Sequence, residues 1–167
     1  MVIGVSAGVG KSTFANQLGE NLHIKVHHLD KLFWKPNWVE ASREEFISVQ
    51  EEIVKDEEWI IEGNYSNTFE SRLRKADTII YLELPLYVCL YRVLKRRIQH
   101  HGKVRPDMTM GCEEKLDWEF LKYILKTYSP RKRKMREYFQ SLQDSKEVII
   151  LNKKRDMKMF LEQLKVS

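Results

Sequence analysis

The ten residues from Gly4 to Thr13, GVSAGVGKST, restrict this chain more than any other stretch. A short apolar run precedes them and a helical pattern follows, so we expect them to join a buried strand to a helix. Small residues before Gly-Lys-Ser are typical of a phosphate-binding loop, in which backbone N–H groups turn inward, the lysine reaches the terminal phosphates and the hydroxyl ligates magnesium. The positive end of the helix adds to the attraction. We therefore expect ATP to bind Ala7, Gly8, Val9, Gly10, Lys11, Ser12 and Thr13, with Lys11 also catalytic and Ser12 a ligand of Mg²⁺.

The loop departs from the usual pattern at one position. A small residue, most often glycine, is expected five positions before Gly10, and that position is Val5. The nearest glycine, Gly4, lies one place too early. A glycine-rich strand-to-helix turn with an incidental lysine is the alternative interpretation, but the strand before and the helix after favour the phosphate-binding loop.

Length and composition predict one globular domain over residues 1–167, with 43% hydrophobic and 32% charged residues. No apolar run approaches the roughly 20 residues that cross a bilayer, so we expect no membrane contact. Met1 leads directly into a strand, which argues against a secretory signal and favours the cytoplasm. The histidine pairs His27-His28 and His100-His101 and the two cysteines lack the spacing of metal ligands.

The net charge of +5 is unevenly distributed. Residues 86–136 hold 14 Lys and Arg against 5 Asp and Glu, a net charge of +9, which leaves −4 for the rest of the chain. This asymmetry predicts a site for a polyanion, and by itself it does not separate ATP from nucleic acid. The basic run from Arg131 to Arg136 is typical of a solvated helix face.

Strand and helix patterns alternate along the chain, which predicts a three-layer α/β/α fold around a five-stranded parallel sheet. Ser42 is expected to cap a helix that runs to about Asp56 and buries Phe46, Val49 and Ile53. Ser129-Pro130 is expected to separate two helices and to cap the second of them.

Two acidic residues are predicted at the carboxyl ends of strands, where parallel sheets place their ligands. Glu62 ends one strand beside the loop and is expected to anchor Mg²⁺ through water. Asp30 ends another and has two interpretations. It acts as a base or ligand for an acceptor hydroxyl, or it caps the segment that follows.

Two segments outside the predicted sheet are candidates for substrate contacts. An insert at about residues 31–57 begins with three aromatic residues between Leu32 and Trp38, which either cover the core or form the wall of an acceptor pocket. A glycine-bracketed stretch at about residues 98–116 has the length of a lid.

Three local matches resemble the adenylate-kinase-like branch of P-loop kinases: the loop itself, Ile60-Ile61-Glu62-Gly63, and Leu84-Pro85 followed by Arg92 and Arg96-Arg97. The resemblance implies a nucleoside-monophosphate-kinase-like fold with a short lid. It also implies that Arg92 lies against the ATP base and that Arg96 clamps phosphates.

A closer resemblance, to the DNA topology modulation (FlaR-type) proteins, covers nearly the whole chain. It rests on residues 29–34, 59–65, Arg105-Pro106-Asp107, Gly111-Cys112 and residues 116–119. The chain departs from adenylate kinases at Glu62, where the wider family has Asp. It departs again at Asn64-Tyr65-Ser66, which replaces the segment that holds the monophosphate, so AMP is not the expected acceptor.

These observations predict phosphoryl transfer from ATP–Mg²⁺ to a small acceptor, with Lys11, Asp30, Arg96 and Arg105 as the catalytic residues. Arg43 and Arg72 either bind an acidic group of the acceptor or lie on the surface as ordinary residues. Two alternatives stay open: a DNA-binding protein switched by ATP, which is less favoured because no DNA-reading motif is present, and an NTPase without an acceptor. A monomer or a homodimer is expected.

Overall fold

The computed structural model describes residues 1–99, 104, 108–113, 118–142 and 146–165. Within these residues, five parallel strands form the central sheet, as the alternating pattern predicts, and the structure shows their order to be β2-β5-β1-β6-β7. Their bounds are β1 (Val2–Gly4), β2 (Val26–His28), β5 (Ile60–Glu62), β6 (Thr78–Leu82) and β7 (Glu147–Leu151). The central position of β1 places the loop that follows it between the ends of its two neighbours.

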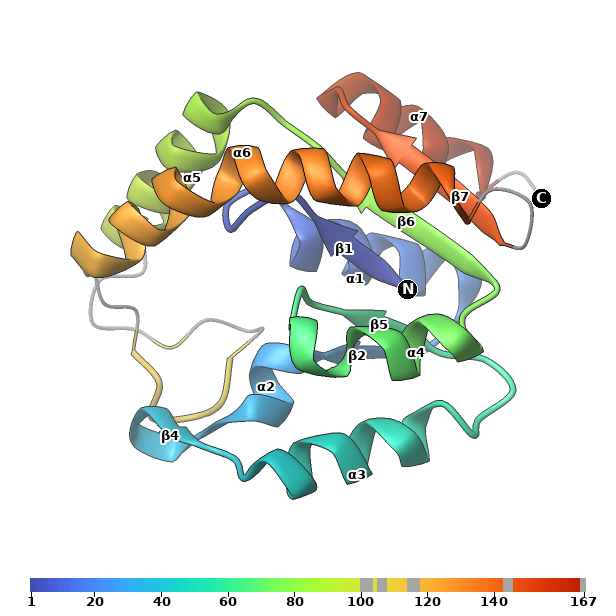
Figure 1. The fold of residues 1–167 in the computed structure, drawn as a ribbon, viewed down its shortest axis with the longest axis horizontal. Coiled ribbons are helices and arrows are strands. Elements are labelled where there is room, and N and C mark those ends of the chain that lie inside the picture. The colour runs from blue at the N-terminus through green and yellow to red at the C-terminus, as the bar shows by residue number, and fades with distance from the viewer. Residues whose placement is uncertain (100–103, 105–107, 114–117, 143–145, 166–167) are drawn as a thin grey trace.

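Helices cover both faces of this sheet, so the described chain has the three predicted layers (Figure 1). Their bounds are α1 (Lys11–Leu22), α2 (Leu29–Phe33), α3 (Arg43–Ile53), α4 (Phe69–Lys75), α5 (Leu86–Gln99), α6 (Trp118–Gln140) and α7 (Lys154–Gln163). Helices α1 and α7 pack together on one face, where the rings of Phe14 and Phe160 are 6.1 Å apart. Helices α4 and α6 cover the other face, and Phe69 meets Tyr138 between them with 5.8 Å between ring centroids.

Buried strands explain why the sheet forms where it does. Every residue of β1 and β5 is buried, which fits strands covered by helices on both faces. A second, smaller hydrophobic cluster lies under the insert, where Phe46 and Ile53 of α3 pack with Leu29 and Ile61. The predicted helical stripe is wrong at Val49, which is 37% exposed.

Helix α3 begins as predicted, because the Ser42 side chain accepts a hydrogen bond from the Glu45 amide nitrogen at 3.1 Å. Before it lies a small antiparallel ribbon. Its parts are β3 (Trp34–Lys35), the 3₁₀ turn η1 (Pro36–Trp38) and β4 (Val39–Glu40). A second 3₁₀ turn, η2 (Ser66–Thr68), precedes α4.

The described part of the predicted lid lies against α2 and this ribbon. The hydroxyl of Thr109 donates to the carbonyl oxygen of Lys31 at 3.2 Å, and the indole nitrogen of Trp38 donates to the carbonyl oxygen of Glu113 at 3.2 Å. Cys112 is buried beside Lys35. The predicted insert and the described part of the predicted lid therefore contact each other.

The structure corrects the prediction of a helix boundary at Ser129-Pro130. Helix α6 runs through Pro130 without interruption. Ile124 and Tyr128 before the proline and Phe139 after it are all buried on one side of the helix. Burial of large side chains at about 1.5–3 kcal/mol each outweighs the hydrogen bond that proline removes. No described helix is both long enough and apolar enough to cross a membrane.

Replacing Pro130 by alanine should raise the free energy of unfolding by about 1–2 kcal/mol. Alanine restores an N–H donor for the carbonyl of Lys126, and the greater entropy of its unfolded chain reduces the gain. Urea unfolding curves would measure the change. Arg133→Ala, at another exposed position of α6, serves as the control and should stay within about 0.5 kcal/mol of the wild type. A lower stability for Pro130→Ala would show that α6 requires the proline.

Candidate active site

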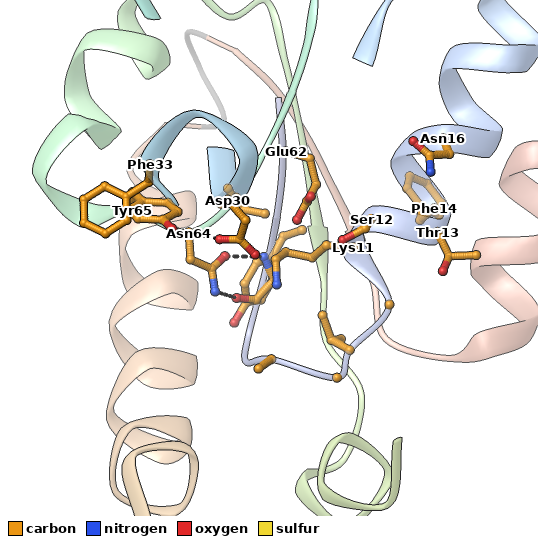
Figure 2. A pocket seen from close by; sticks show the side chains of 18 of the residues that line it. Lys11, Ser12, Thr13, Phe14, Asn16, Asp30, Phe33, Glu62, Asn64 and Tyr65 are labelled. Atoms are coloured by element: carbon orange, nitrogen blue, oxygen red, sulfur yellow. Dashed lines mark hydrogen bonds between the residues drawn. The ribbon is translucent and has the colours of Figure 1, made fainter. Parts of the chain in front are cut away.

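A large open cleft lies at the carboxyl edge of the sheet. The loop after β1 forms one side, and residues of α2, the ribbon and the segment after β5 form the other. Figure 2 shows Lys11, Asp30 and Glu62 extending toward the same part of this cleft from three different elements. The fold thus brings Lys11 of the loop together with the two carboxylates that the sequence analysis placed at the ends of separate strands.

The loop has the backbone shape that its glycines predict. Gly8 and Gly10 have φ values of 76° and 103°, in the left-handed region that favours glycine. A Cβ atom on Gly8 would lie 2.2 Å from the carbonyl oxygen of Cys89 in α5, so a side chain is excluded there by contact as well. Helix α1 begins directly after the loop, where the Phe14 amide donates to the carbonyl oxygen of Gly10 at 3.0 Å.

The structure explains why the first glycine of the loop is residue 4 and not residue 5. A Cβ atom on Gly4 would lie 2.6 Å from a methyl carbon of Val9, whose side chain is fully buried beneath the loop. The space that glycine provides is therefore needed at position 4. Val5 is itself fully buried, and its amide donates to the carbonyl oxygen of Leu82 at 2.9 Å, which extends the pairing of β1 with β6.

Asn64 joins the segment after β5 to the base of the loop. Its side-chain oxygen accepts from the Gly4 amide nitrogen at 3.0 Å, and its side-chain nitrogen donates to the Gly4 carbonyl oxygen at 2.8 Å. The last backbone contact of this pair of strands is the bond from the Gly63 amide to the carbonyl of Val2, at 3.2 Å. The amide group of Asn64 therefore continues the β1–β5 ladder by one further step.

Lys11 and Ser12 lie in the first turn of α1, and both line the cleft. The ammonium group of Lys11 donates to the carbonyl oxygen of Ser6 at 3.4 Å, so its side chain lies back along the loop. Ala7, Val9 and Thr13 also line the cleft, and their contact with ATP stays a prediction.

Glu62 has a partner that the sequence interpretation missed. Its carboxylate lies 3.0 Å from Nδ1 of His28, and both side chains are over nine-tenths buried. The Nε2 atom of His28 lies 2.9 Å from the side-chain oxygen of Asn16 in α1, so the imidazole connects Glu62 to that helix. His28 is opposite Glu62 in the β2–β5 register. The sequence carried no local signal for this contact, because it depends on which strand pairs with β5.

Asp30 lies inside α2, and His28 occupies the cap position of that helix, so the prediction of Asp30 as a helix cap is wrong. The Tyr65 hydroxyl donates to Oδ1 of Asp30 at 2.8 Å. Burial raises the pKa of Tyr65 well above its ordinary value, and the negative charge of Asp30 adds to the effect. Tyr65 therefore keeps its proton and remains a donor to the carboxylate.

Arg72 is neither a surface residue nor a ligand-facing one, which corrects both interpretations of it. Its side chain is fully buried and donates to the carbonyl oxygens of Gly63, Tyr65 and Thr68 at 3.3, 2.8 and 3.2 Å. Burial lowers the pKa of Arg72 to about 10, so it stays protonated at neutral pH. Arg72 thus holds the segment after β5 in place.

Two arginines of α5, Arg92 and Arg96, line the cleft. Nη1 of Arg92 donates to the carbonyl oxygen of Val9 at 2.8 Å, and Arg96 lines the same cleft one turn later. Arg105 lies outside the described residues. Arg43 is exposed at the start of α3 and lines the cleft on the side of the ribbon.

The basic run on α6 is not simply a solvated face. Arg136 binds both carboxylate oxygens of the buried Glu83, at 2.9 and 2.6 Å, and Lys132 lies 3.1 Å from one of them. Arg131 reaches the loop, where it donates to the carbonyl oxygen of Val5 at 3.5 Å, and it also binds the hydroxyl of Tyr123 at 2.7 Å. Arg131 is a cleft residue that the sequence did not single out.

The aromatic residues of the insert cover the core, as one interpretation predicts, and they also line the cleft; that they form an acceptor pocket stays a prediction. Phe33 packs against Phe46 and Tyr65, with ring centroids 5.2 and 4.9 Å apart, and so covers the small core. Trp34 and Trp38 form an edge-to-face pair at 5.2 Å. Phe33 and both tryptophans also line the cleft.

No family model and no curated protein matches the chain. Solved structures match it over nearly its whole length. A protein provisionally described as a kinase from Chloroflexus aurantiacus J-10-fl has a TM-score of 0.57 and 14% identity, with 99% of this chain and 96% of that chain covered. A gluconokinase from Sinorhizobium meliloti 1021 has a TM-score of 0.52 and 14% identity, with 99% and 91% covered.

A third match is a deoxyadenosine kinase from M. mycoides with bound dATP. It has a TM-score of 0.52 and 15% identity, with 98% of this chain and 99% of that chain covered. At identities this low, the structural match establishes a common fold and nothing more. The chain has the fold of the P-loop kinases.

Replacing Asn64 by alanine should lower the free energy of unfolding by about 2–4 kcal/mol, because the buried amide and carbonyl groups of Gly4 both lose their partner. Chemical denaturation would measure the loss. Asn67→Ala makes the same change at an exposed position of the same segment and should cost less than about 0.5 kcal/mol. Equal stabilities for the two variants would contradict the role given to Asn64.

Cys89 should resist alkylation by iodoacetamide at pH 8. Its side chain is fully buried under the loop, and burial raises the pKa of its thiol to about 11, so the reactive thiolate is scarce. Mass spectrometry of a Cys112→Ser variant would report on Cys89 alone. Modification should appear only in denaturant, and rapid labelling of the native protein would show that the loop opens away from α5.

Proposed function

We propose that this protein transfers the γ-phosphoryl group of ATP to a small acceptor. The observation that carries the proposal is the composition of the cleft. On one side lies a loop with two glycines at positive φ, followed by Lys11 and Ser12, and this loop faces the carboxylates of Asp30 and Glu62. Phosphoryl transfer requires mainly positioning and charge stabilisation, and this cleft offers both. The likeness in fold to kinases agrees with the proposal.

On the nucleotide side, the amides of the loop and Lys11 would hold the β- and γ-phosphates. Ser12 and Glu62 supply the oxygen donors that Mg²⁺ prefers, so the residues present fit this ion. Magnesium would neutralise the charge that develops between the phosphates. His28 would keep the carboxylate of Glu62 in one orientation, as outer-shell partners of metal ligands do.

Four arginines are candidates to stabilise the transferred group. Arg92, Arg96 and Arg131 line the cleft beside the loop. Arg105 belongs to the predicted lid and completes the proposed set. On the acceptor side, Asp30 would take the proton of the attacking group, with Tyr65 holding its carboxylate in place.

The resemblance to the DNA topology modulation proteins leaves a DNA-binding alternative, and the positions of the basic residues count against it. Arg92 and Arg131 bond to the loop, while Lys132 and Arg136 bind Glu83. These four residues are engaged within the fold, so the excess positive charge of residues 86–136 is a weaker sign of a nucleic-acid surface than it was in the sequence. An NTPase without an acceptor would not need a carboxylate at Asp30 and aromatic side chains lining the same cleft, although Phe33 also covers the small core.

Replacing Lys11 by alanine should weaken ATP–Mg²⁺ binding about 10- to 100-fold, the loss expected for charge-assisted hydrogen bonds to phosphate. Isothermal titration with a non-hydrolysable ATP analogue would measure it. Lys25→Ala removes an exposed lysine from another segment and should bind as the wild type does. An unchanged affinity in Lys11→Ala would remove the basis of the proposal.

A further inference from the structure

The segment from Gly63 to Thr68, called the bridge below, connects the two sides of the cleft. It follows β5, leads into α4 and lines the cleft along its length. Asn64 and Tyr65 are consecutive in the bridge, yet their side chains bond to different elements, Asn64 to the end of β1 and Tyr65 to α2. Figure 2 shows Tyr65 beside Phe33, with Asn64 extending from the same stretch on the side toward Lys11.

At one end of the bridge, Gly4 connects Asn64 to the residues proposed to hold phosphate. The Asn64 side chain accepts from the Gly4 amide at 3.0 Å and donates to the Gly4 carbonyl oxygen at 2.8 Å. Gly4 packs closely against the loop, because a Cβ atom there would lie 2.6 Å from Cγ1 of Val9 and 3.1 Å from Cγ of Lys11. A displacement of Val9 or Lys11 when phosphate binds therefore acts on Gly4 directly, and through Gly4 on Asn64.

At the other end, the bridge contacts α2 at several points. The Tyr65 hydroxyl donates to Oδ1 of Asp30 at 2.8 Å, and the Tyr65 ring lies 4.9 Å from the ring of Phe33. Gly63, whose φ is 143°, packs so closely on α2 that a Cβ atom there would lie 2.7 Å from the Cβ of Leu29. The position of α2, and of the Asp30 carboxylate on it, therefore depends on where the bridge lies.

Arg72 makes the bridge move as one piece. Its fully buried guanidinium donates to the carbonyl oxygens of Gly63, Tyr65 and Thr68, at 3.3, 2.8 and 3.2 Å, which spans the bridge from its first residue to its last. A buried charge that loses its hydrogen-bond partners is strongly unfavourable, so these three carbonyls keep their relative positions. A displacement at one end of the bridge is therefore transmitted to the other end.

We propose that Asn64 and Tyr65 are positioning residues that couple the nucleotide site to Asp30, so that a nucleotide bound at the loop restrains α2. This inference rests on the proposed phosphotransferase function, in which the loop holds ATP and Asp30 meets the acceptor. Contiguous packing and hydrogen bonds provide the physical path, from the loop through Gly4 and the bridge to α2. Such coupling is reciprocal, so a restraint on α2 also strengthens nucleotide binding.

Hydrogen exchange with mass spectrometry tests the coupling with ADP–Mg²⁺, which occupies the loop and lacks the γ-phosphate nearest the acceptor. In the wild type, ADP should slow amide exchange at least about fivefold in peptides that cover α2, as well as in the loop. In Asn64→Ala the loop should still be protected, and the slowing in α2 should fall below about twofold. Asn67→Ala, at an exposed position of the bridge, is the control and should match the wild type. Each variant is compared with itself without ADP, so a lower overall stability does not affect the ratio.

Tyr65→Phe provides a second variant that keeps the ring and its packing and removes the bond to Asp30. Because the coupling is reciprocal, this change should weaken ADP–Mg²⁺ binding about three- to tenfold in isothermal titration. In the Asn64→Ala background, where the path is already interrupted, the same change should weaken binding less than about 1.5-fold. Tyr87→Phe, an identical change at an exposed position of α5, should leave the affinity unaltered. If Asn64→Ala does not fold, Tyr65→Phe decides the question in the exchange experiment, where it should at least halve the slowing in α2.

The possible failures are distinguishable. Slowing that stays confined to the loop in the wild type would overturn the coupling and leave the proposed function intact. Full slowing of α2 in Asn64→Ala would also overturn it, because the nucleotide would then act on α2 without the bridge. Equal losses of ADP affinity from Tyr65→Phe in the two backgrounds would have the same meaning. A wild-type protein that binds neither ADP–Mg²⁺ nor ATP–Mg²⁺ would instead contradict the proposed function, and this inference with it.

Discussion

The pairing of β1 with both of its neighbours is the constraint on which the rest of the structure depends. The loop proposed to bind phosphate begins where β1 ends, so its position is fixed only as well as that end is held. On the β6 side, the backbone continues the ladder through Val5. On the β5 side the strand has ended, and the side chain of Asn64 supplies the missing donor and acceptor to Gly4. The loop is therefore anchored on both sides.

Buried charges in this protein serve to position the segments around the cleft. Arg72 gathers the carbonyl groups of the turn after β5, and the Glu62–His28 pair connects that strand to β2 and α1. Glu83, which directly follows β6, holds α6 at the end of that strand by accepting two hydrogen bonds from Arg136. Charges removed from water are costly unless hydrogen-bonded, so each of these groups restricts its segment to a narrow set of positions.

Much of the fold could be predicted from the sequence because the patterns that specify its strands, helices and caps lie in short, contiguous stretches of the chain. The parallel α/β architecture follows from alternating buried strands and helical stripes, and Ser42 caps α3 as its pattern predicts. The same local reasoning failed at Pro130, because proline signals a helix boundary only when no long-range burial opposes it. In α6 the contacts of Tyr128 and Phe139 with the core continue across the proline.

In the candidate site too, local sequence patterns specify some of the residues and long-range packing determines the others. The sequence by itself determined the loop, the helix that follows it and the two carboxylates at strand ends, because contiguous residues and strand ends specify them. Only the tertiary structure decided which arginines lie at the cleft: Arg131 reaches the loop from a distant helix, whereas Arg72 is buried. It also decided that His28 meets Glu62 and that Tyr65 meets Asp30. These contacts join residues more than 30 positions apart, and no local pattern encodes which polar side chain the packing of the chain will bring to a given carboxylate.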